Sequence, residues 1–385
     1  MKLIKGDRRR ARAAGLVWAV AIVAASGCGT DHSADPGTVP KAPTVRVEPA
    51  VREGALASAR VWQAPALPIS QANLAVNPRG EFSPDDEVSC RFNPKKVGGT
   101  TPKFNCDLPG GETIKIKYGR GNPELNAEVA ATRLLVALGF HADRMFVVKR
   151  VRCAGCPPFP FQALRCLDRV DVQAACFPGG LDYDRVVDFD AAVVERRIPG
   201  RVIEASPDQG WGWFEVGKID PARGGSSRSE VDAFRLMAVF LAHWDNKDAN
   251  QRLICPTGAD GPEGACTAPI AIMQDLGATF GPTKVNLHNW RQGRIWKDSA
   301  SCLVSMEHLP WGGGTFPEAK ISDAGRQHLL GLLEQLTDAQ LSDLFESSGI
   351  TKLEQVSAES RRVEAWVAAF KDRVKQIRDA GPCPS

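Results

Sequence analysis

The 385-residue sequence lacks the signatures of several common protein classes. It has no internal repeat and no collagen or coiled-coil pattern. Neither Gly-x-Ser-x-Gly nor His-Glu-x-x-His occurs, so two familiar hydrolase motifs are missing. The apolar run from Ala13 to Ala25 is too short to span a membrane comfortably. With 43% apolar and 24% charged residues, the chain can still bury an ordinary core.

The first 28 residues are typical of an export signal. A basic head precedes the apolar run and contains Lys2, Lys5, Arg8, Arg9, Arg10 and Arg12. The run ends in Ala25-Ser26-Gly27-Cys28, which resembles a bacterial lipobox with alanine where leucine is usual. The resemblance implies a lipid on Cys28 and a membrane anchor at the periplasmic side of the cell envelope. Glycine at position 29, in place of aspartate, favours the outer membrane. The alternative is a secretory signal that is cleaved without lipidation.

The charge of the mature chain argues against nucleic-acid binding. The whole chain carries a formal net charge of +3. Residues 1–27 contribute six positive charges and one negative, a net of +5, so their removal leaves 3 − 5 = −2. A mildly acidic domain has no general attraction to a phosphate backbone.

The cysteine count favours disulfides. Eleven cysteines less Cys28 leave ten, an even number, in a chain expected outside the cytoplasm. Closures between Cys166 and Cys176, and between Cys255 and Cys266, are compatible with the spacing, although sequence does not fix connectivity. Cys153-Ala154-Gly155-Cys156 has zinc-like spacing, but no second pair of that kind occurs.

Composition divides the chain into three parts. After the signal at 1–28, residues 29–60 are rich in Pro, Ala, Thr and Asp, which predicts a flexible tether. Residues 61–385 have a globular composition. Their first part reads mainly as strands and their second part mainly as helices.

Local patterns predict several elements. Residues 113–118 alternate as a strand, with Lys115 and Lys117 on one face. A helix should begin at Asn122-Pro123 and end at Gly139. Ser229 and Asp232 resemble a capping box before an apolar helix, and two amphipathic helices are expected near 322–346 and 358–380. The tryptophans Trp211, Trp213, Trp290, Trp296 and Trp311 are expected to line the core or a cleft, and Glu195-Arg196-Arg197 to form a solvated strand end.

The sharpest chemical signal is the segment 243–250, His-Trp-Asp-Asn-Lys-Asp-Ala-Asn, followed by a strand that ends in Asp275-Leu276-Gly277. Phosphoryl transfer needs a carboxylate to orient the attacking hydroxyl and oxygen ligands to hold magnesium. Together the two segments resemble the catalytic loop and metal-binding triplet of the protein-kinase-like superfamily. The resemblance implies that Asp245 is the catalytic base, that Lys247 neutralises the transferring phosphate, and that His243 is structural. It makes Asn250 and Asp275 the magnesium ligands.

The upstream half supplies further parts in the order the resemblance requires. Lys117, or Lys115 on the same face, is expected to contact the nucleotide phosphates. Glu128 lies early in the next helix and is expected to pair with that lysine. The usual Gly-x-Gly-x-x-Gly loop is absent. The segment Gly98-Gly99-Thr100-Thr101-Pro102-Lys103 stands in its place and resembles the phosphate loop of HipA-type kinases.

The implied fold is α+β: a two-lobed, protein-kinase-like domain, close to the HipA-type, CotH-type and secretory-pathway kinases. Its strand-rich N-lobe would cover about 61–200 and its mainly helical C-lobe about 201–385. The implied activity is magnesium-dependent transfer of a phosphoryl group from ATP, or another nucleoside triphosphate, to an unknown hydroxyl. The base pocket is expected between the Lys117 strand and residues 193–200. Alternatives are transfer of a nucleotidyl group, a catalytically inactive pseudokinase lipoprotein that binds or scaffolds a partner, and a structural envelope protein.

Overall fold

The computed structural model describes residues 46–385 except 79, 171–172, 208, 282–284, 311–313, 354–356 and 385. The export signal, the lipobox with Cys28 and the first part of the tether therefore lie outside the described residues, as does Trp311. Within the described residues, no helix is both long enough and apolar enough to cross a membrane.

Five strands of the first half close into a barrel in the order β1-β2-β3-β5-β4. They are β1 (Glu87–Asn93), β2 (Lys103–Asp107), β3 (Thr113–Tyr118), β4 (Arg144–Ala154) and β5 (Val186–Arg196). Neighbouring pairs are antiparallel except β1 and β4, which run parallel and close the barrel. Alternation decides the two faces of β3, because Ile114 and Ile116 enter the apolar core of the barrel while Lys115 and Lys117 point outward.

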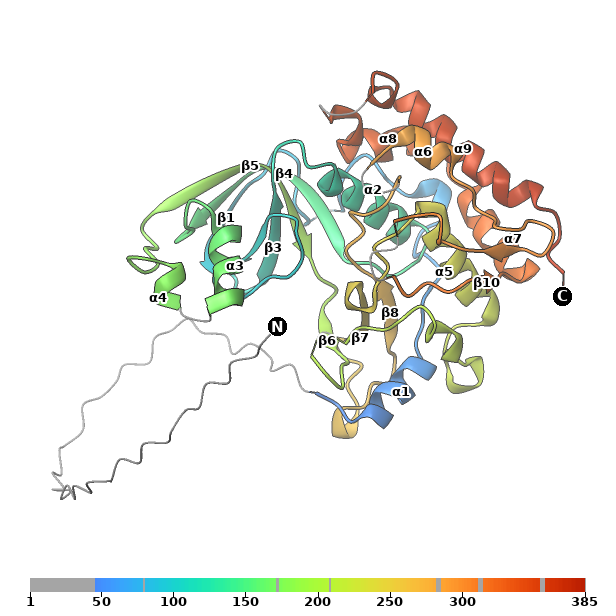
Figure 1. The fold of residues 1–385 in the computed structure, drawn as a ribbon, viewed down its shortest axis with the longest axis horizontal. Helices are drawn as coiled ribbons and strands as arrows, with labels where there is room; N and C mark the ends of the chain where they lie inside the picture. The colour runs from blue at the N-terminus through green and yellow to red at the C-terminus, as the bar shows by residue number, and fades with distance from the viewer. Residues whose placement is uncertain are drawn as a thin grey trace, which may run out of the picture. The chain divides into compact units, whose positions relative to one another are not determined.

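Helices flank the barrel on different sides. α3 (Pro160–Val170) and the short α4 (Gln173–Cys176) follow β4. α2 (Pro123–Ala137) packs on the outside of β4 and β5, where Leu125 and Val129 meet Met145 and Val193. Figure 1 shows α2 between the barrel strands and the C-terminal helices, and it contacts α8. The helix begins as predicted, because the Asn122 side chain accepts a hydrogen bond from the backbone N–H of Glu124.

The second half is mainly helical, and its helices share a large apolar core with α2. Its helices are α5 (Arg228–Leu241), α6 (Leu287–Gln292), α7 (Asp323–Leu333), α8 (Asp338–Ser347) and α9 (Val363–Asp379). Two small sheets accompany them, β6-β7-β8 (Gly200–Val202, Gln251–Pro256 and Ile270–Met273) and β9-β10 (Leu303–Val304 and Ala319–Lys320). Single 3₁₀ turns lie at Ile69–Gln71, Val216–Lys218, Pro221–Arg223, Asp248–Asn250, Pro262–Gly264, Ile350–Lys352 and Glu359–Arg361. The chain is thus a mixed α/β protein with one apolar core in the barrel and a separate one that α2 shares with the second half.

Three sequence predictions about boundaries are wrong. The tether predicted for 29–60 ends earlier, because α1 (Pro49–Ala57) is folded and Arg52 forms a buried ion pair with Glu215 at 2.9 Å. The capping box of α5 uses Ser227 and Glu230, two residues before the predicted pair. The helix expected near 322–346 is two helices, because Thr337 and Gln340 form a new capping box that starts α8.

Ten cysteines form five disulfides among the described residues, which is consistent with an exported protein. The two closures proposed from spacing, Cys166–Cys176 and Cys255–Cys266, are both present. Cys153 and Cys156 are bonded to each other, so they are not thiolate ligands for zinc. The remaining pairs are Cys90–Cys106 and Cys302–Cys383.

Four of the predicted core tryptophans, Trp211, Trp213, Trp290 and Trp296, are buried in the core of the helical half, as expected. Their ring N–H groups are largely satisfied by main-chain carbonyls, for example Trp290 Nε1 to Phe240 O at 2.9 Å. These rings belong to the core and do not form an exposed carbohydrate platform.

Candidate active site

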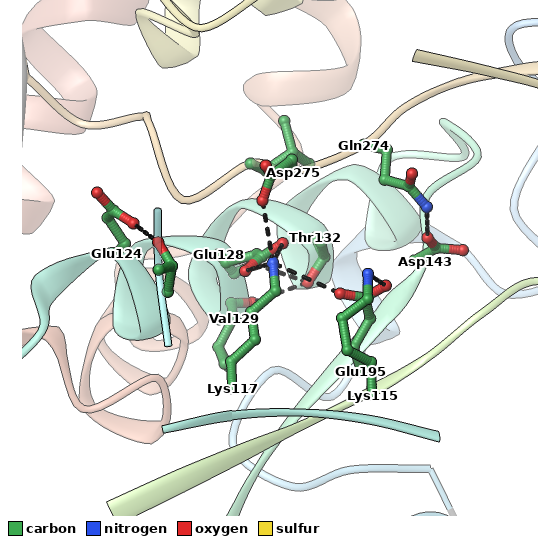
Figure 2. A network of polar contacts seen from close by, with 12 residues as sticks. Lys115, Lys117, Glu124, Glu128, Val129, Thr132, Asp143, Glu195, Gln274 and Asp275 are labelled. Atoms are coloured by element: carbon green, nitrogen blue, oxygen red, sulfur yellow. Dashed lines mark hydrogen bonds and ion pairs between the residues drawn. The ribbon is translucent and has the colours of Figure 1, made fainter. Parts of the chain in front are cut away.

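The centre of the candidate site is the ammonium of Lys117, which contacts three carboxylates from three different elements. Its Nζ lies 2.6 Å from Glu128 on α2, 3.0 Å from Asp275 after β8, and 3.4 Å from Glu195 on β5. Lys117 and Asp275 are 158 residues apart in the chain, so this contact joins the barrel to the second half of the protein. The predicted ion pair between Lys117 and Glu128 is present, and Figure 2 shows these side chains converging.

Burial and neighbouring charges perturb all of these groups. Burial alone would lower the pKa of Lys117, but Asp275, Glu128 and Glu195 together raise it well above its ordinary value. Lys117 in turn holds the pKa of Asp275 well below its usual range, so Asp275 stays ionised. Burial, reinforced by Asp275 and Glu195, raises the pKa of Glu128 to about 7 despite its contact with Lys117. For Glu128, the attraction to Lys117 therefore does not fully offset burial and the repulsion from Asp275 and Glu195.

Glu195 is a site residue that sequence reasoning missed. It was expected at a solvated strand end, yet its side chain is only 2% exposed and accepts a hydrogen bond from Lys115 at 2.5 Å. Burial opposes its ionisation, but Lys115, Lys117 and Arg197 outweigh that cost and lower the pKa of Glu195 to about 2. The available signal was the pairing of β3 with β5, which sets Glu195 opposite Lys115.

The predicted phosphate loop lies against the start of α2. Gly98, Gly99 and Thr100 are exposed, and Gly99 has a φ of +79°, which favours glycine. A Cβ on Gly99 would lie 3.0 Å from Nζ of Lys103, so the ammonium of this buried lysine reaches the loop. Within the described part of the chain, Lys103 has no ion-pair partner. A buried cation beside exposed glycines is a suitable contact for an anion.

The turn that carries Asp275 packs on the same helix start. A Cβ on Gly277 would lie 3.0 Å from Cβ of Glu124 and 3.2 Å from its carbonyl oxygen, so glycine permits this close approach. The side chain of Glu124 in turn accepts a hydrogen bond from Thr101 of the phosphate loop. Asp275 itself has a φ of 54°, in the left-handed region that non-glycine residues seldom adopt. The loop, the helix start and the turn thus surround the Lys117 cluster.

Segment 243–250 lies next to this turn. The backbone N–H of Gln274 donates to the carbonyl of Asn250 at 3.0 Å, and that of Trp244 donates to Ala278 at 3.3 Å. The Asn250 amide donates to the backbone carbonyl of Asp245 at 2.8 Å, which holds the two ends of the segment together. The carboxylate of Asp245 is paired with Lys247 at 2.9 Å.

Two buried residues hold the 243–250 segment in place. His243 is fully buried, and burial lowers its pKa to about 4, so it is neutral at pH 7, in keeping with a structural part. Asn246, which sequence reasoning did not single out, donates to the carbonyl of His243 at 3.0 Å and accepts from the N–H groups of Thr315 and Phe316 at 2.9 and 3.0 Å. In the sequence, the one indication that Asn246 matters to the site was its position between Asp245 and Lys247.

Sequence reasoning also missed a hydrogen-bonded bridge between Asp143 and Gln274. Buried Asp143, at the start of β4, accepts hydrogen bonds from the Gln274 side chain and, at 2.9 Å, from the backbone N–H of Ile198 (Figure 2). Burial raises the pKa of Asp143. Because Gln274 precedes Asp275, this bridge ties the Asp275 turn to the segment that leaves β5.

The donor set suits a magnesium ion. Asp275 offers an ionised carboxylate, 36% exposed, and Asn250 offers an amide oxygen with no hydrogen-bond partner among the described residues. Oxygen ligands of this kind are what magnesium prefers. The part of the chain that the structure describes holds one cluster with classic soft-metal ligands, Cys90, Cys106 and Cys153, and these are disulfide-bonded.

Comparisons with known proteins add little. No protein-family model and no curated protein matches the chain. Among solved structures, the crystal structure of the proinflammatory kinase CtkA of Helicobacter pylori is similar with a TM-score of 0.41 and 11% sequence identity. The similarity covers 77% of this chain and 96% of that one. At that TM-score the similarity carries no argument, so the function proposed below depends on this chain's own contacts.

Proposed function

We propose that the chain is a magnesium-dependent phosphotransferase with a two-lobed, protein-kinase-like fold. The observation that carries the proposal is the contact of Lys117 with both Glu128 and Asp275, beside the segment that contains Asp245 and Asn250. A lysine held by a helix glutamate next to a metal-binding aspartate is the arrangement used to position nucleotide phosphates. The barrel half forms one lobe and the helical half the other.

Each site residue then has one task. Lys117 and Lys103 neutralise the phosphates of the nucleotide, and the exposed backbone of Gly98, Gly99 and Thr100 cradles them. Glu128 fixes the direction of the Lys117 side chain. Asn250 and Asp275 hold magnesium, which when bound neutralises phosphate oxygens as charge develops on the leaving group.

On the acceptor side, Asp245 orients the hydroxyl that attacks and takes its proton. Lys247, held 2.9 Å from Asp245, is placed to neutralise the phosphoryl group as it moves. The acceptor is a hydroxyl on a protein or a small molecule outside the cytoplasm. The five disulfides support that location, and the N-terminal pattern supports a lipid anchor on Cys28.

The test combines a binding assay and a transfer assay on the same proteins. Wild type and Asp245→Asn are incubated with magnesium and γ-labelled ATP or GTP, and binding is followed separately by thermal stabilisation. Because a general base contributes about 10²- to 10⁴-fold to rate, labelling should fall by that factor in Asp245→Asn while nucleotide binding persists. Asp248→Asn, an exposed aspartate in the same segment, is the matched control and should label as wild type does.

Three outcomes contradict the proposal in different ways. Equal labelling by wild type and Asp245→Asn removes Asp245 as the base. Nucleotide binding without any labelling favours the second candidate, a pseudokinase that binds a nucleotide and recognises a partner at the cell envelope. No binding of any nucleotide in the presence of magnesium refutes the proposed function as a whole.

A further inference from the structure

The outer face of β3 continues from the phosphate end of the site into a second charged position. Lys103 and Lys117 are opposite each other in the β2–β3 register, next to the phosphate loop. Lys115 lies two residues back along the strand, which is about 7 Å away on the same face. Its register partners are Asn105 on one side and Glu195 on the other. A nucleoside joined to phosphates held at Lys117 therefore reaches the level of Lys115 and Glu195.

The chemistry at this level is unusual for a pocket that takes a flat base. Lys115 and Glu195 are joined at 2.5 Å, and the side chain of Glu195 is only 2% exposed. Both oxygens of Glu195 are engaged, one by Lys115 and the other by Lys117 at 3.4 Å. Lys115 remains 15% exposed, and an ammonium group has three donors, of which Glu195 uses one. The group presented to a ligand is therefore a hydrogen-bond donor with no acceptor capacity.

One backbone donor of the neighbouring segment is already engaged within the protein. The segment that leaves β5 would be the other wall of the base pocket, and the backbone N–H of Ile198 already donates to Asp143 at 2.9 Å. Figure 2 shows Lys115 beside Lys117 and Glu195, on the side of the cluster that faces Asp143 and Gln274. Lys115 is therefore a side chain at this level that still has donors for a base.

We infer that Lys115 selects a nucleotide whose base carries a carbonyl oxygen at position 6 of a purine or position 4 of a pyrimidine, as in guanine, hypoxanthine or uracil, over one that carries an amino group there, as in adenine or cytosine. A carbonyl oxygen accepts a hydrogen bond from the ammonium, whereas an exocyclic amino group sets donor against donor. Glu195 acts as a positioning residue that fixes the direction of the Lys115 side chain. This inference rests on the proposed nucleotide-binding function and adds its base specificity.

The decisive ligands are ATP and inosine triphosphate, because they differ at position 6 of the purine, amino in one and carbonyl in the other, and at the adjoining N1, which carries a hydrogen only in inosine triphosphate. Dissociation constants for both magnesium complexes are measured by calorimetry with the wild-type chain. One well-made hydrogen-bonded contact to a base edge discriminates by roughly tenfold. We expect inosine and guanosine triphosphates to bind about tenfold more tightly than ATP.

Two variants test whether Lys115 causes the preference for inosine triphosphate over ATP. Lys115→Met keeps the length of the side chain and removes the donor, so the ratio between inosine triphosphate and ATP should fall to about one. Lys149→Met removes an exposed lysine of β4 that pairs with Glu87, and it should keep the wild-type ratio. The wild-type ligand series needs no variant, so it remains informative if Lys115→Met folds poorly.

The outcomes separate the two proposals. If ATP binds as tightly as inosine triphosphate or more tightly, the inference about Lys115 is wrong while the phosphotransferase proposal survives. A tenfold preference that persists unchanged in Lys115→Met also refutes it. If neither nucleotide binds with magnesium, the proposed function itself has failed.

Discussion

Replacement of Lys117 by methionine removes the ammonium that Glu128, Glu195 and Asp275 share. Loss of one partner from a buried ion pair costs about 3–5 kcal/mol of unfolding free energy. Asp275 adds little to this cost, because its side chain is 36% exposed and water screens its charge. The buried carboxylates, 5% and 2% exposed for Glu128 and Glu195, carry most of it.

The unfolding free energy lost in Lys117→Met should depend on pH, and the structure gives the direction. The pKa of Glu128 is already raised to about 7, and loss of Lys117 raises it further. Glu128 therefore takes up a proton near pH 6, which relieves part of the repulsion, and does so less completely at pH 8. We expect Lys117→Met to cost about 4 kcal/mol at pH 8 and about 3 kcal/mol or less at pH 6.

Equilibrium urea unfolding of the disulfide-bonded wild type and Lys117→Met at the two pH values measures this loss of unfolding free energy. Lys149→Met is the control, because the Lys149–Glu87 pair is 59% and 38% exposed and solvent screening leaves it only a small contribution to stability. The double variant Lys117→Met/Glu128→Gln should recover about 1–2 kcal/mol of the loss, since it removes a stranded carboxylate. If Lys117→Met is no more destabilising than Lys149→Met, the three carboxylates do not depend on this lysine and the reasoning is refuted.

Two other predictions follow from buried groups. The pKa of Glu195 is about 2 in the folded protein against an ordinary 4.5, so its ionised form stabilises the fold above pH 4.5 and this contribution is lost as the pH falls toward 2. Glu195→Gln should therefore lose about 3 kcal/mol less than wild type between pH 5 and 2, and identical acid-unfolding curves would contradict this. Cys302–Cys383 joins residues 81 apart and Cys255–Cys266 residues 11 apart, so replacing the first pair by alanine should cost about 4.5 kcal/mol and the second about 3 kcal/mol. Thermal unfolding that ranks the second loss above the first would contradict the loop-entropy argument.

The sequence predicted those parts of the site that depend on local pattern. Alternation placed Lys115 and Lys117 on one strand face, and an asparagine followed by proline marked the start of α2. From these two elements the pairing of Lys117 with Glu128 followed, because the glutamate lies one turn into the helix that packs on that strand. The resemblance made Asp275 a magnesium ligand, and its contact with Lys117 at 3.0 Å is a finding of the structure.

The contacts that were missed all depend on which strands become neighbours. Glu195 looked solvated because it lies among arginines near the end of a strand, and only the β3–β5 register turns it toward Lys115. Asp143 and Gln274 are 131 residues apart, and no local pattern links them. The error in the tether had a different cause, since its alanines and prolines suggested disorder while Arg52 pairs with Glu215, 163 residues away. Composition does not report a partner that distant.

The close seating of Gly277 on Glu124 has a mechanical consequence. Glu124 and Glu128 are one turn apart on α2. Glu124, which contacts the Asp275 turn, and Glu128, which pairs with Lys117, therefore move together with the helix. A movement of this helix away from the barrel would break the lysine contact and displace the Asp275 turn with it. A change that displaces α2 would therefore disturb Lys117 and Asp275 together.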